Sequence, residues 1–363
     1  RVRAAGSPAS PAPTTTTSTV EAGALSGPEL VTWTFAMTSP SFALQPYFLC
    51  RQPAAYRCAS AGAVMTFCDG SGWCDAAIIG PATTLNHMPE GDTIWRVARQ
   101  LDEQLRDHQL VATDFRVPRF ATVSLASKHV LGVRSRGKHL LIDVADGGDS
   151  PPSVIVHSTL GMDGAWRIYQ MSDRWSGGPG HQIRAVIKTP TAAAVGYRLP
   201  HVDVFSPAEA SKRLAHLGPD LLGADWDPAR ALANLEARPA AQIGSVLLDQ
   251  RVLAGIGNVY KSELCFLART NPWVPVSAVP ELSSIVANAH QLLMANRQGP
   301  KRVTTGDPRH PLWVYGRHGQ PCRVCGTAIR VAAQGTAPEQ RRTWWCPTCQ
   351  SATHLGESTD MSM

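Results

Sequence analysis

The spacing of apolar residues predicts a helix followed by a series of short strands. In residues 93–108, Ile94, Val97, Ala98, Leu101 and Leu105 fall on one face of a helix. Six β-rich runs follow, separated by turn residues such as Asp146-Gly147-Gly148; they span 120–125, 130–133, 139–144, 154–157, 164–169 and 183–188. Many short strands with this punctuation indicate an antiparallel sandwich or barrel. We expect an α+β protein whose first domain, 88–215, is such a sandwich with a leading helix.

The pattern becomes helical in the next stretch, for which we expect a second domain over 216–312. Leu217-Gly218-Pro219-Asp220 is typical of a linker, and residues 241–251 are amphipathic. Gly255-Ile256-Gly257 predicts a tight turn, with Asn258 opening the next helix. A glycine turn at a helix N-terminus offers backbone N–H groups that suit a phosphate. The glycines alone are weak evidence, since any turn between helices can use them.

Four cysteines predict a third, metal-stapled domain over 313–350, followed by a flexible tail, 351–363. Cys322, Cys325, Cys346 and Cys349 form two Cys-x2-Cys pairs, a spacing that closes a tetrahedral Zn²⁺ site. Disulfides are the less favoured alternative, because no signal peptide places the chain in an oxidising compartment. Between the pairs lie Arg330, Arg341 and Arg342. These arginines suit DNA, although an ordinary zinc ribbon with a solvated basic face has the same pattern.

The first 87 residues show no sustained apolar period. Residues 4–28 consist almost entirely of Ala, Ser, Pro, Thr and Gly, a composition typical of disorder. We expect residues 1–87 to be a disordered or spurious leader; a small regulatory or redox segment is the alternative. Their charges cancel, so the net charge of +6 belongs to residues 88–363. This excess mildly favours a polyanionic partner, and no apolar run approaches the ~18 residues of a membrane span.

Pro89 could act as a nucleophile only if it is the N-terminal residue of the protein. If translation starts at Met88 and the methionine is trimmed, Pro89 becomes a terminal secondary amine, which can attack a carbonyl carbon and form an iminium. The ordinary pKa of an α-amino group, about 8, leaves a useful fraction unprotonated at neutral pH. Glu90 could then act as general acid. The alternative is that Pro89 merely opens a helix with acids in its first turn.

Two further residues lie in turns of the predicted sandwich. Lys138, in Arg136-Gly137-Lys138-His139, stands between two strands, where a solvated hairpin lysine is the ordinary interpretation. Met162, in Gly161-Met162-Asp163-Gly164, is either a core residue or an exposed wedge that enters a base stack.

Taken together, these motifs resemble the formamidopyrimidine-DNA glycosylase/endonuclease VIII family of base-excision repair enzymes. The resemblance covers residues 88–350 and rests on Pro89-Glu90-Gly91-Asp92-Thr93, Arg136-Gly137-Lys138, Gly255-Ile256-Gly257-Asn258, and Tyr315-Gly316-Arg317 followed by the four cysteines. The residues of these motifs are similar to those of the actinobacterial endonuclease VIII type 2 group. The fold it implies is a sandwich, a helix–two-turn–helix domain and a zinc finger.

The resemblance also implies roles. Pro89 would attack C1′ of the damaged nucleotide, Glu90 would protonate the opening sugar, and Lys138 and Arg341 would assist β- and δ-elimination. Asn258, with Gly257 beside it, would hold a phosphate, Met162 would fill the gap left by the flipped base, and Arg342 and His216 would contact DNA. The four cysteines would hold one structural zinc ion.

The implied activity is a bifunctional glycosylase and abasic-site lyase that removes oxidised bases, pyrimidines above all. The implied partner is damaged duplex DNA, with bubble or single-stranded DNA as further substrates. We expect a cytoplasmic, nucleoid-associated monomer without membrane contact. Thr159, Gly161 and His216 depart from residues frequent in relatives, which leaves lesion preference open. The competing hypothesis is a non-catalytic DNA-binding protein whose leader blocks Pro89.

Overall fold

The computed structural model describes residues 89–337 and 340–351. The expected leader, residues 1–87, and the tail from residue 352 lie outside the described residues. The predicted first helix is present as α1 (Gly91–Leu105), and its apolar residues Ile94, Ala98, Leu101 and Leu105 are buried.

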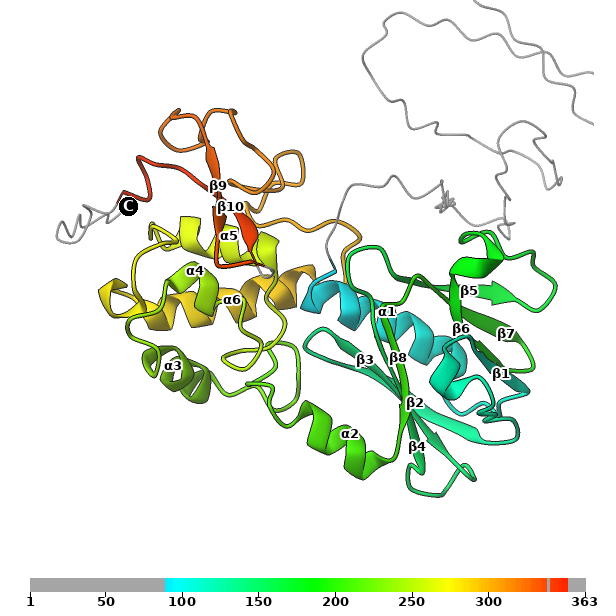
Figure 1. Cartoon of the computed structure of the whole chain (residues 1–363). Helices are drawn as coiled ribbons and strands as arrows, with labels where there is room; N and C mark the ends of the chain where they lie inside the picture. The colour runs from blue at the N-terminus through cyan, green and yellow to red at the C-terminus, as the bar shows by residue number, and fades with distance from the viewer. Residues whose placement is uncertain (1–88, 338–339, 352–363) are drawn as a thin grey trace, which may run out of the picture. The chain divides into compact units, whose positions relative to one another are not determined.

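Two four-stranded antiparallel sheets follow α1 (Figure 1). One has the order β2-β3-β4-β8, and the other the order β1-β6-β7-β5. The strands are β1 (Ala112–Phe115), β2 (His129–Arg136), β3 (His139–Ala145), β4 (Val154–Thr159), β5 (Ala165–Gln170), β6 (Ile183–Lys188), β7 (Ala192–Tyr197) and β8 (His201–Phe205). Short 3-10 turns are η1 (Pro118–Phe120) and η2 (Gly180–Gln182). One buried cluster joins α1 to residues of both sheets, including Phe115, Ile142 and Ala194.

The strand predicted at 120–125 is wrong. Phe120 ends η1, and successive turns follow, in which the Val123 N–H donates to the Phe120 carbonyl. Pro118 fixes the backbone of this segment and removes a donor. The segment still delivers Phe120 and Leu125 to the core, which explains its apolar pattern.

Helices form the next part of the chain, shown as a group in Figure 1. They are α2 (Pro207–Leu214), α3 (Pro228–Glu236), α4 (Ile243–Val246), α5 (Asn258–Leu267) and α6 (Leu282–Asn296), with the 3-10 turn η3 (Val276–Ala278). The amphipathic stretch 241–251 contains only the short α4, because turns take over from Leu247. Among the described residues, no helix combines the length and the apolarity that crossing a membrane requires.

The last elements form the hairpin of β9 (Arg330–Gln334) and β10 (Arg341–Trp345), which pairs antiparallel. In Figure 1, β10 lies beside α5. Phe266 of α5 packs in one cluster with Val314, Ile329 and two of the cysteines. The hairpin is thereby fixed to the helix that begins at Asn258.

Candidate functional site

Glu90 lies at the N-terminus of α5, far from it in sequence. Its carboxylate accepts hydrogen bonds from the backbone N–H groups of Gly257 (2.8 Å), Val259 (2.7 Å) and Tyr260 (3.3 Å). A carboxylate is favoured there by the unpaired N–H groups and by the helix dipole. A Cβ on Gly257 would come within 2.4 Å of Glu90. Gly257 therefore allows the approach that fixes Glu90, and its N–H is engaged by this carboxylate.

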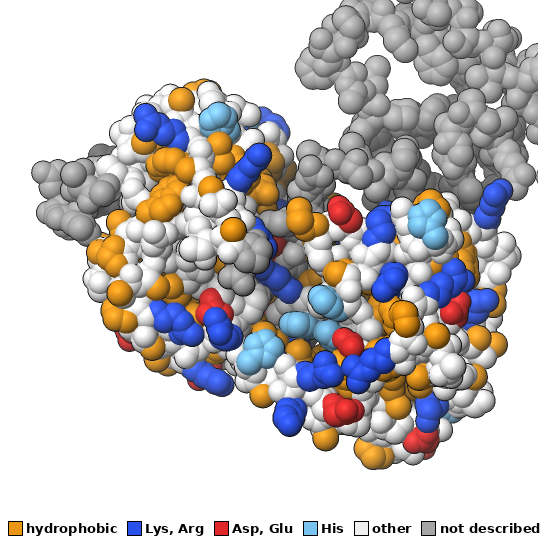
Figure 2. All heavy atoms as spheres, viewed as in Figure 1, with side chains coloured by type: hydrophobic (Ala, Val, Ile, Leu, Met, Phe, Trp, Pro, Cys, Tyr) orange, Lys and Arg blue, Asp and Glu red, His pale blue; other side chains and the backbone are white. Residues whose placement is uncertain are grey.

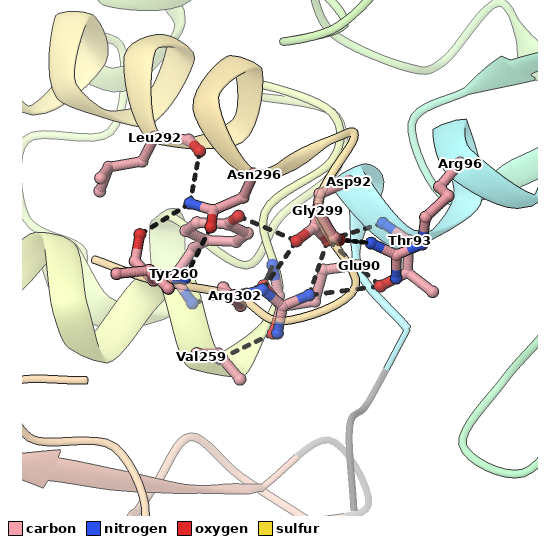
Figure 3. A network of polar contacts seen from close by, with 12 residues as sticks. Glu90, Asp92, Thr93, Arg96, Val259, Tyr260, Leu292, Asn296, Gly299 and Arg302 are labelled. Atoms are coloured by element: carbon pink, nitrogen blue, oxygen red, sulfur yellow. Dashed lines mark hydrogen bonds and ion pairs between the residues drawn. The ribbon is translucent and has the colours of Figure 1, made fainter. Parts of the chain in front are cut away.

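A second buried carboxylate, Asp92, binds Arg302 through two hydrogen bonds of 2.8 and 2.6 Å (Figure 3). Arg302 also lies 3.8 Å from Glu90, and the Tyr260 hydroxyl donates to Asp92 at 2.9 Å. Burial alone would raise the pKa of Asp92, but the hydrogen bonds and charge of Arg302 hold it below its usual value. This network anchors the chain immediately after Pro89.

Lys138 lies in the turn between β2 and β3. Gly137 has a φ of +56°, and a Cβ there would approach the Ala254 Cβ to 2.9 Å, so both conformation and space favour glycine. The Gly137 N–H donates to the buried carboxylate of Asp220 at 2.8 Å. Burial lowers the pKa of Lys138, opposed by the charge of Glu90. A lowered pKa is typical of amines that take part in catalysis.

Pro89 and Lys138 line the same cavity, of about 350 Å³. Its other walls are Ile94, His139, Thr159, Leu160, Gly161, Pro200 and His201. The Thr159 hydroxyl is buried and has no hydrogen-bond partner among the described residues. The cavity thus brings a proline, an amine and one unsatisfied hydroxyl together, and a few convergent polar groups of this kind can orient a bound ligand.

Asn258 and Arg342 contact each other. The Asn258 side chain donates to the Arg342 carbonyl at 2.8 Å, and buried Lys261 donates to the Thr343 hydroxyl at 2.6 Å. Burial lowers the pKa of Lys261 to about 8. These bonds tie α5 to β10, and so fix the strand that begins with Arg341.

The remaining predicted residues are exposed. Met162 is 71% exposed, after Gly161 with its φ of +58°. Arg341 and Arg342 are exposed on β10, and the charge of Arg341 contributes to lowering the pKa of Lys138. His216 is exposed, with Nδ1 2.8 Å from the Arg213 carbonyl. Figure 2 shows Lys, Arg and His side chains gathered near the middle of one face.

The four cysteines form one cluster, in which all sulfur atoms lie within 4.8 Å of one another. The Cys322 and Cys349 sulfurs are 3.8 Å apart, and those of Cys325 and Cys346 are 3.4 Å apart. A metal–sulfur bond of about 2.3 Å gives a tetrahedron whose edges are about 3.8 Å. The donor set therefore fits a tetrahedral metal ion, and all four cysteines are unbridged.

Two family models match the chain. The formamidopyrimidine-DNA glycosylase N-terminal domain matches residues 88–205, and the formamidopyrimidine-DNA glycosylase H2TH domain matches residues 217–296. "Probable endonuclease 8 2" of Streptomyces coelicolor is 53% identical over 266 residues, covering 73% of this chain and 94% of that protein. The chain belongs to the formamidopyrimidine-DNA glycosylase/endonuclease VIII family.

Other members of the family agree. "DNA-(apurinic or apyrimidinic site) lyase Nei2" of Mycolicibacterium smegmatis is 44% identical over 267 residues, covering 73% of this chain and all of that protein. A solved structure of Lactococcus lactis Fpg in complex with abasic-site DNA has a TM-score of 0.60 at 21% identity, over 72% of this chain and 99% of that one. This likeness shows a shared fold over 72% of this chain.

Three buried polar residues that hold the candidate site together are not predicted from the sequence. Arg302, Asp220 and Lys261 are buried polar residues whose partners lie far away in the sequence. No local pattern marks Arg302 or Lys261. Asp220 lies in the stretch Leu217-Gly218-Pro219-Asp220, whose pattern predicts only a linker. An acidic residue directly after Gly-Pro is the one local feature that could have drawn attention to it.

Proposed function

We propose that this protein is a bifunctional DNA glycosylase and abasic-site lyase of base-excision repair, with Pro89 as its nucleophile. The observation that carries this proposal is the cavity shared by Pro89 and Lys138. The relatives named as endonuclease 8 and as abasic-site lyase support the same activity and do not favour a non-catalytic DNA-binding protein.

In this mechanism the Pro89 nitrogen attacks C1′ of the damaged nucleotide and the base departs. The resulting iminium acidifies the hydrogens on C2′, so elimination of the 3′ phosphate follows. Glu90, which follows Pro89 directly and is fixed on α5, would protonate the opening sugar. Lys138 would assist β-elimination from the same cavity, and Arg341 would bind phosphate and aid δ-elimination.

The DNA contacts that we propose are those of exposed or turn residues. Met162 would enter the stack where the base has flipped, because it is an exposed apolar side chain on a tight turn. His216, Asn258 and Arg342 would contact the backbone. We keep Gly257 in this turn, although its N–H is held by Glu90.

For substrate and setting, we propose oxidised pyrimidines in duplex, bubble or single-stranded DNA. The protein would act as a monomer on the nucleoid in the cytoplasm, since its substrate is there. The chain would comprise a catalytic sandwich (88–215), a helix–two-turn–helix domain (216–312) and a finger (313–350).

The ion at the four cysteines would be zinc, in a structural role. Zinc favours four thiolates in tetrahedral geometry, and a site filled by four protein ligands has no position for substrate. Its contribution would be to hold the β9–β10 hairpin, and with it Arg341, in place.

Pro89 can act as a nucleophile only after the peptide bond to Met88 has been cleaved. While Met88 is attached, the Pro89 nitrogen is a tertiary amide without a hydrogen, and its lone pair is delocalised. The family model begins at Met88, and the whole Mycolicibacterium relative matches about three quarters of this chain. We propose that the active form starts at Pro89 and that residues 1–87 are dispensable for folding.

Trapping with borohydride tests this function. Reduction should join the active form to an oligonucleotide that contains an abasic site, and peptide mapping should find the modification on Pro89. Modification of Lys138 instead would show that the nucleophile is misassigned. Absence of any adduct and of strand cleavage would overturn the lyase activity.

A further inference from the structure

A group of histidines adjoins the cavity that Pro89 and Lys138 share. His139 lines this cavity, and its Nδ1 lies 2.9 Å from Nε2 of the buried His157. The two rings stack, with centroids 5.1 Å apart. His201 and His216 are close enough to affect the titration of His139. Nothing in the proposed function uses His139 or His157.

Asp203 sets the proton positions in this group. Oδ2 of Asp203 is 3.5 Å from Nδ1 of His157, which is an ion-pair distance, and this buried nitrogen has no hydrogen-bond partner among the described residues. An ionised carboxylate only accepts, so it favours the His157 tautomer that carries hydrogen on Nδ1. Nε2 of neutral His157 is then an acceptor, and Nδ1 of His139 must donate to it. The other nitrogen of His139, Nε2, is left with a lone pair.

The order carboxylate, imidazole, imidazole therefore ends in an unprotonated nitrogen of His139, a residue that lines the cavity. A carboxylate that orients an imidazole in this way also stabilises the imidazolium that forms when the ring accepts a proton. In this protein Asp203 orients His157, and His157 in turn orients His139. The strands that carry them, β3, β4 and β8, are neighbours in one sheet, so the group is rigidly held.

We propose that His139 is the general base of the lyase step, taking the hydrogen from C2′ of the Pro89 iminium. This inference rests on the proposed function. The C2′–H bond breaks and its proton passes to Nε2 of His139. The electron pair forms a C1′=C2′ double bond and neutralises the iminium nitrogen. The nitrogen lone pair then re-forms the C1′=N iminium, and the C1′=C2′ pair shifts to make a C2′=C3′ double bond. The C3′–O bond breaks, and its electrons leave with the 3′ phosphate.

The electrostatics keep His139 in the form that this step needs. Burial, together with the charges of His157, His216, His201 and Lys138, lowers its pKa to about 4. Arg213 and Asp203 act on His157, whose pKa is also lowered, mainly by burial. His139 is thus neutral at neutral pH. Its contribution is present above pH 4 and is lost as the pH falls through that value.

The test compares His139→Gln with His181→Gln, both in the form that starts at Pro89. The described residues from Pro89 onward belong to one compact unit, and a relative matches this chain over its whole length. His181 is an exposed histidine of η2, so the same substitution there controls for the loss of an imidazole. Single-turnover cleavage and borohydride trapping are measured on one preformed abasic oligonucleotide, with hydrogen or deuterium at C2′.

His139→Gln should retain trapping and slow β-elimination about 100-fold, the lower end of what general bases contribute. The deuterium isotope effect on cleavage should increase, because proton removal becomes rate-limiting. Imidazole added to His139→Ala should restore part of the rate. Asp203→Asn should slow cleavage less than His139→Gln does, because Asp203 acts through His157.

Cleavage by His139→Gln within twofold of the His181→Gln control would overturn the assignment. So would a parallel loss of trapping and cleavage, which would place His139 before the iminium. Failure of the proposed function looks different: the unsubstituted protein itself would then neither trap nor cleave.

Discussion

Replacing Arg302 by leucine should markedly lower the urea concentration at which the protein unfolds. The guanidinium is only 4% exposed and binds Asp92 through bonds of 2.6 and 2.8 Å, with Glu90 3.8 Å away. Its removal leaves two carboxylates buried without their cation. Breaking a buried ion pair in this way costs about 3–5 kcal/mol, because the remaining charge is uncompensated. We therefore expect the free energy of unfolding to fall by about 3–5 kcal/mol.

The matched control is Arg99→Leu. Arg99 also belongs to an arginine–carboxylate pair of α1, with Glu103, but its side chain is 62% exposed. Exposed helical pairs contribute about 0.3–0.5 kcal/mol. Both variants and the parent are unfolded with urea. The unfolding midpoints report the change in stability provided that the slope of free energy against urea concentration, the m-value, is the same for all three proteins.

The pH dependence gives an independent check on this network. Arg302 holds the pKa of Asp92 below its usual value, so the associated stability is present above the unfolded pKa of about 3.9. It is lost as the pH falls through the lower, folded pKa. The difference between the parent and Arg302→Leu should therefore shrink on acidification. A difference below about 1 kcal/mol at neutral pH, or one that grows in acid, would refute the reasoning.

Three further outcomes follow from the site. Cys322→Ser should release zinc and unfold the β9–β10 hairpin while the sheets stay folded; unchanged zinc content would show that the site is misread. Arg341→Ala should weaken binding to damaged and intact duplexes alike and reduce the salt dependence of log K by about one unit; full affinity would contradict the phosphate contact. Met162→Ala should leave trapping on abasic sites intact but slow removal of a stacked base, whereas Met171→Ala, also at an exposed methionine, should change neither trapping nor base removal.

What could be predicted from the sequence depended on whether the signal was local. The cysteine spacing, the turn at Gly257 and the helix that opens at Asn258 are each contained in a few residues. Strands β2 to β6 were also predicted from their apolar residues, whereas β1 and β8 were not predicted. β7 was missed because its sequence, Ala-Ala-Ala-Val-Gly-Tyr, is buried throughout and alternates nowhere.

Partnerships across the fold could not be predicted. Arg302 meets Asp92, and Asp220 meets Gly137, only because the helical part of the chain packs against α1 and the β2–β3 turn. His139 and His157 come together through the register of β3 and β4, in which His139 pairs with Thr159. The register between two strands cannot be predicted from a single sequence, so the contact between these two histidines could not be predicted either.

The central claim is that the Pro89 nitrogen is the nucleophile, and the covalent state of that nitrogen tests it most directly. Two forms are compared on one abasic oligonucleotide with borohydride: the 363-residue chain, its N-terminus verified by mass, and the chain that starts at Pro89. In the longer chain the lone pair of the Pro89 nitrogen is delocalised into the Met88 carbonyl and cannot attack C1′. Only the shorter form should therefore be trapped by borohydride and cut the strand. Comparable trapping by the verified 363-residue chain would contradict the Pro89 mechanism and indicate Lys138 as the attacking amine.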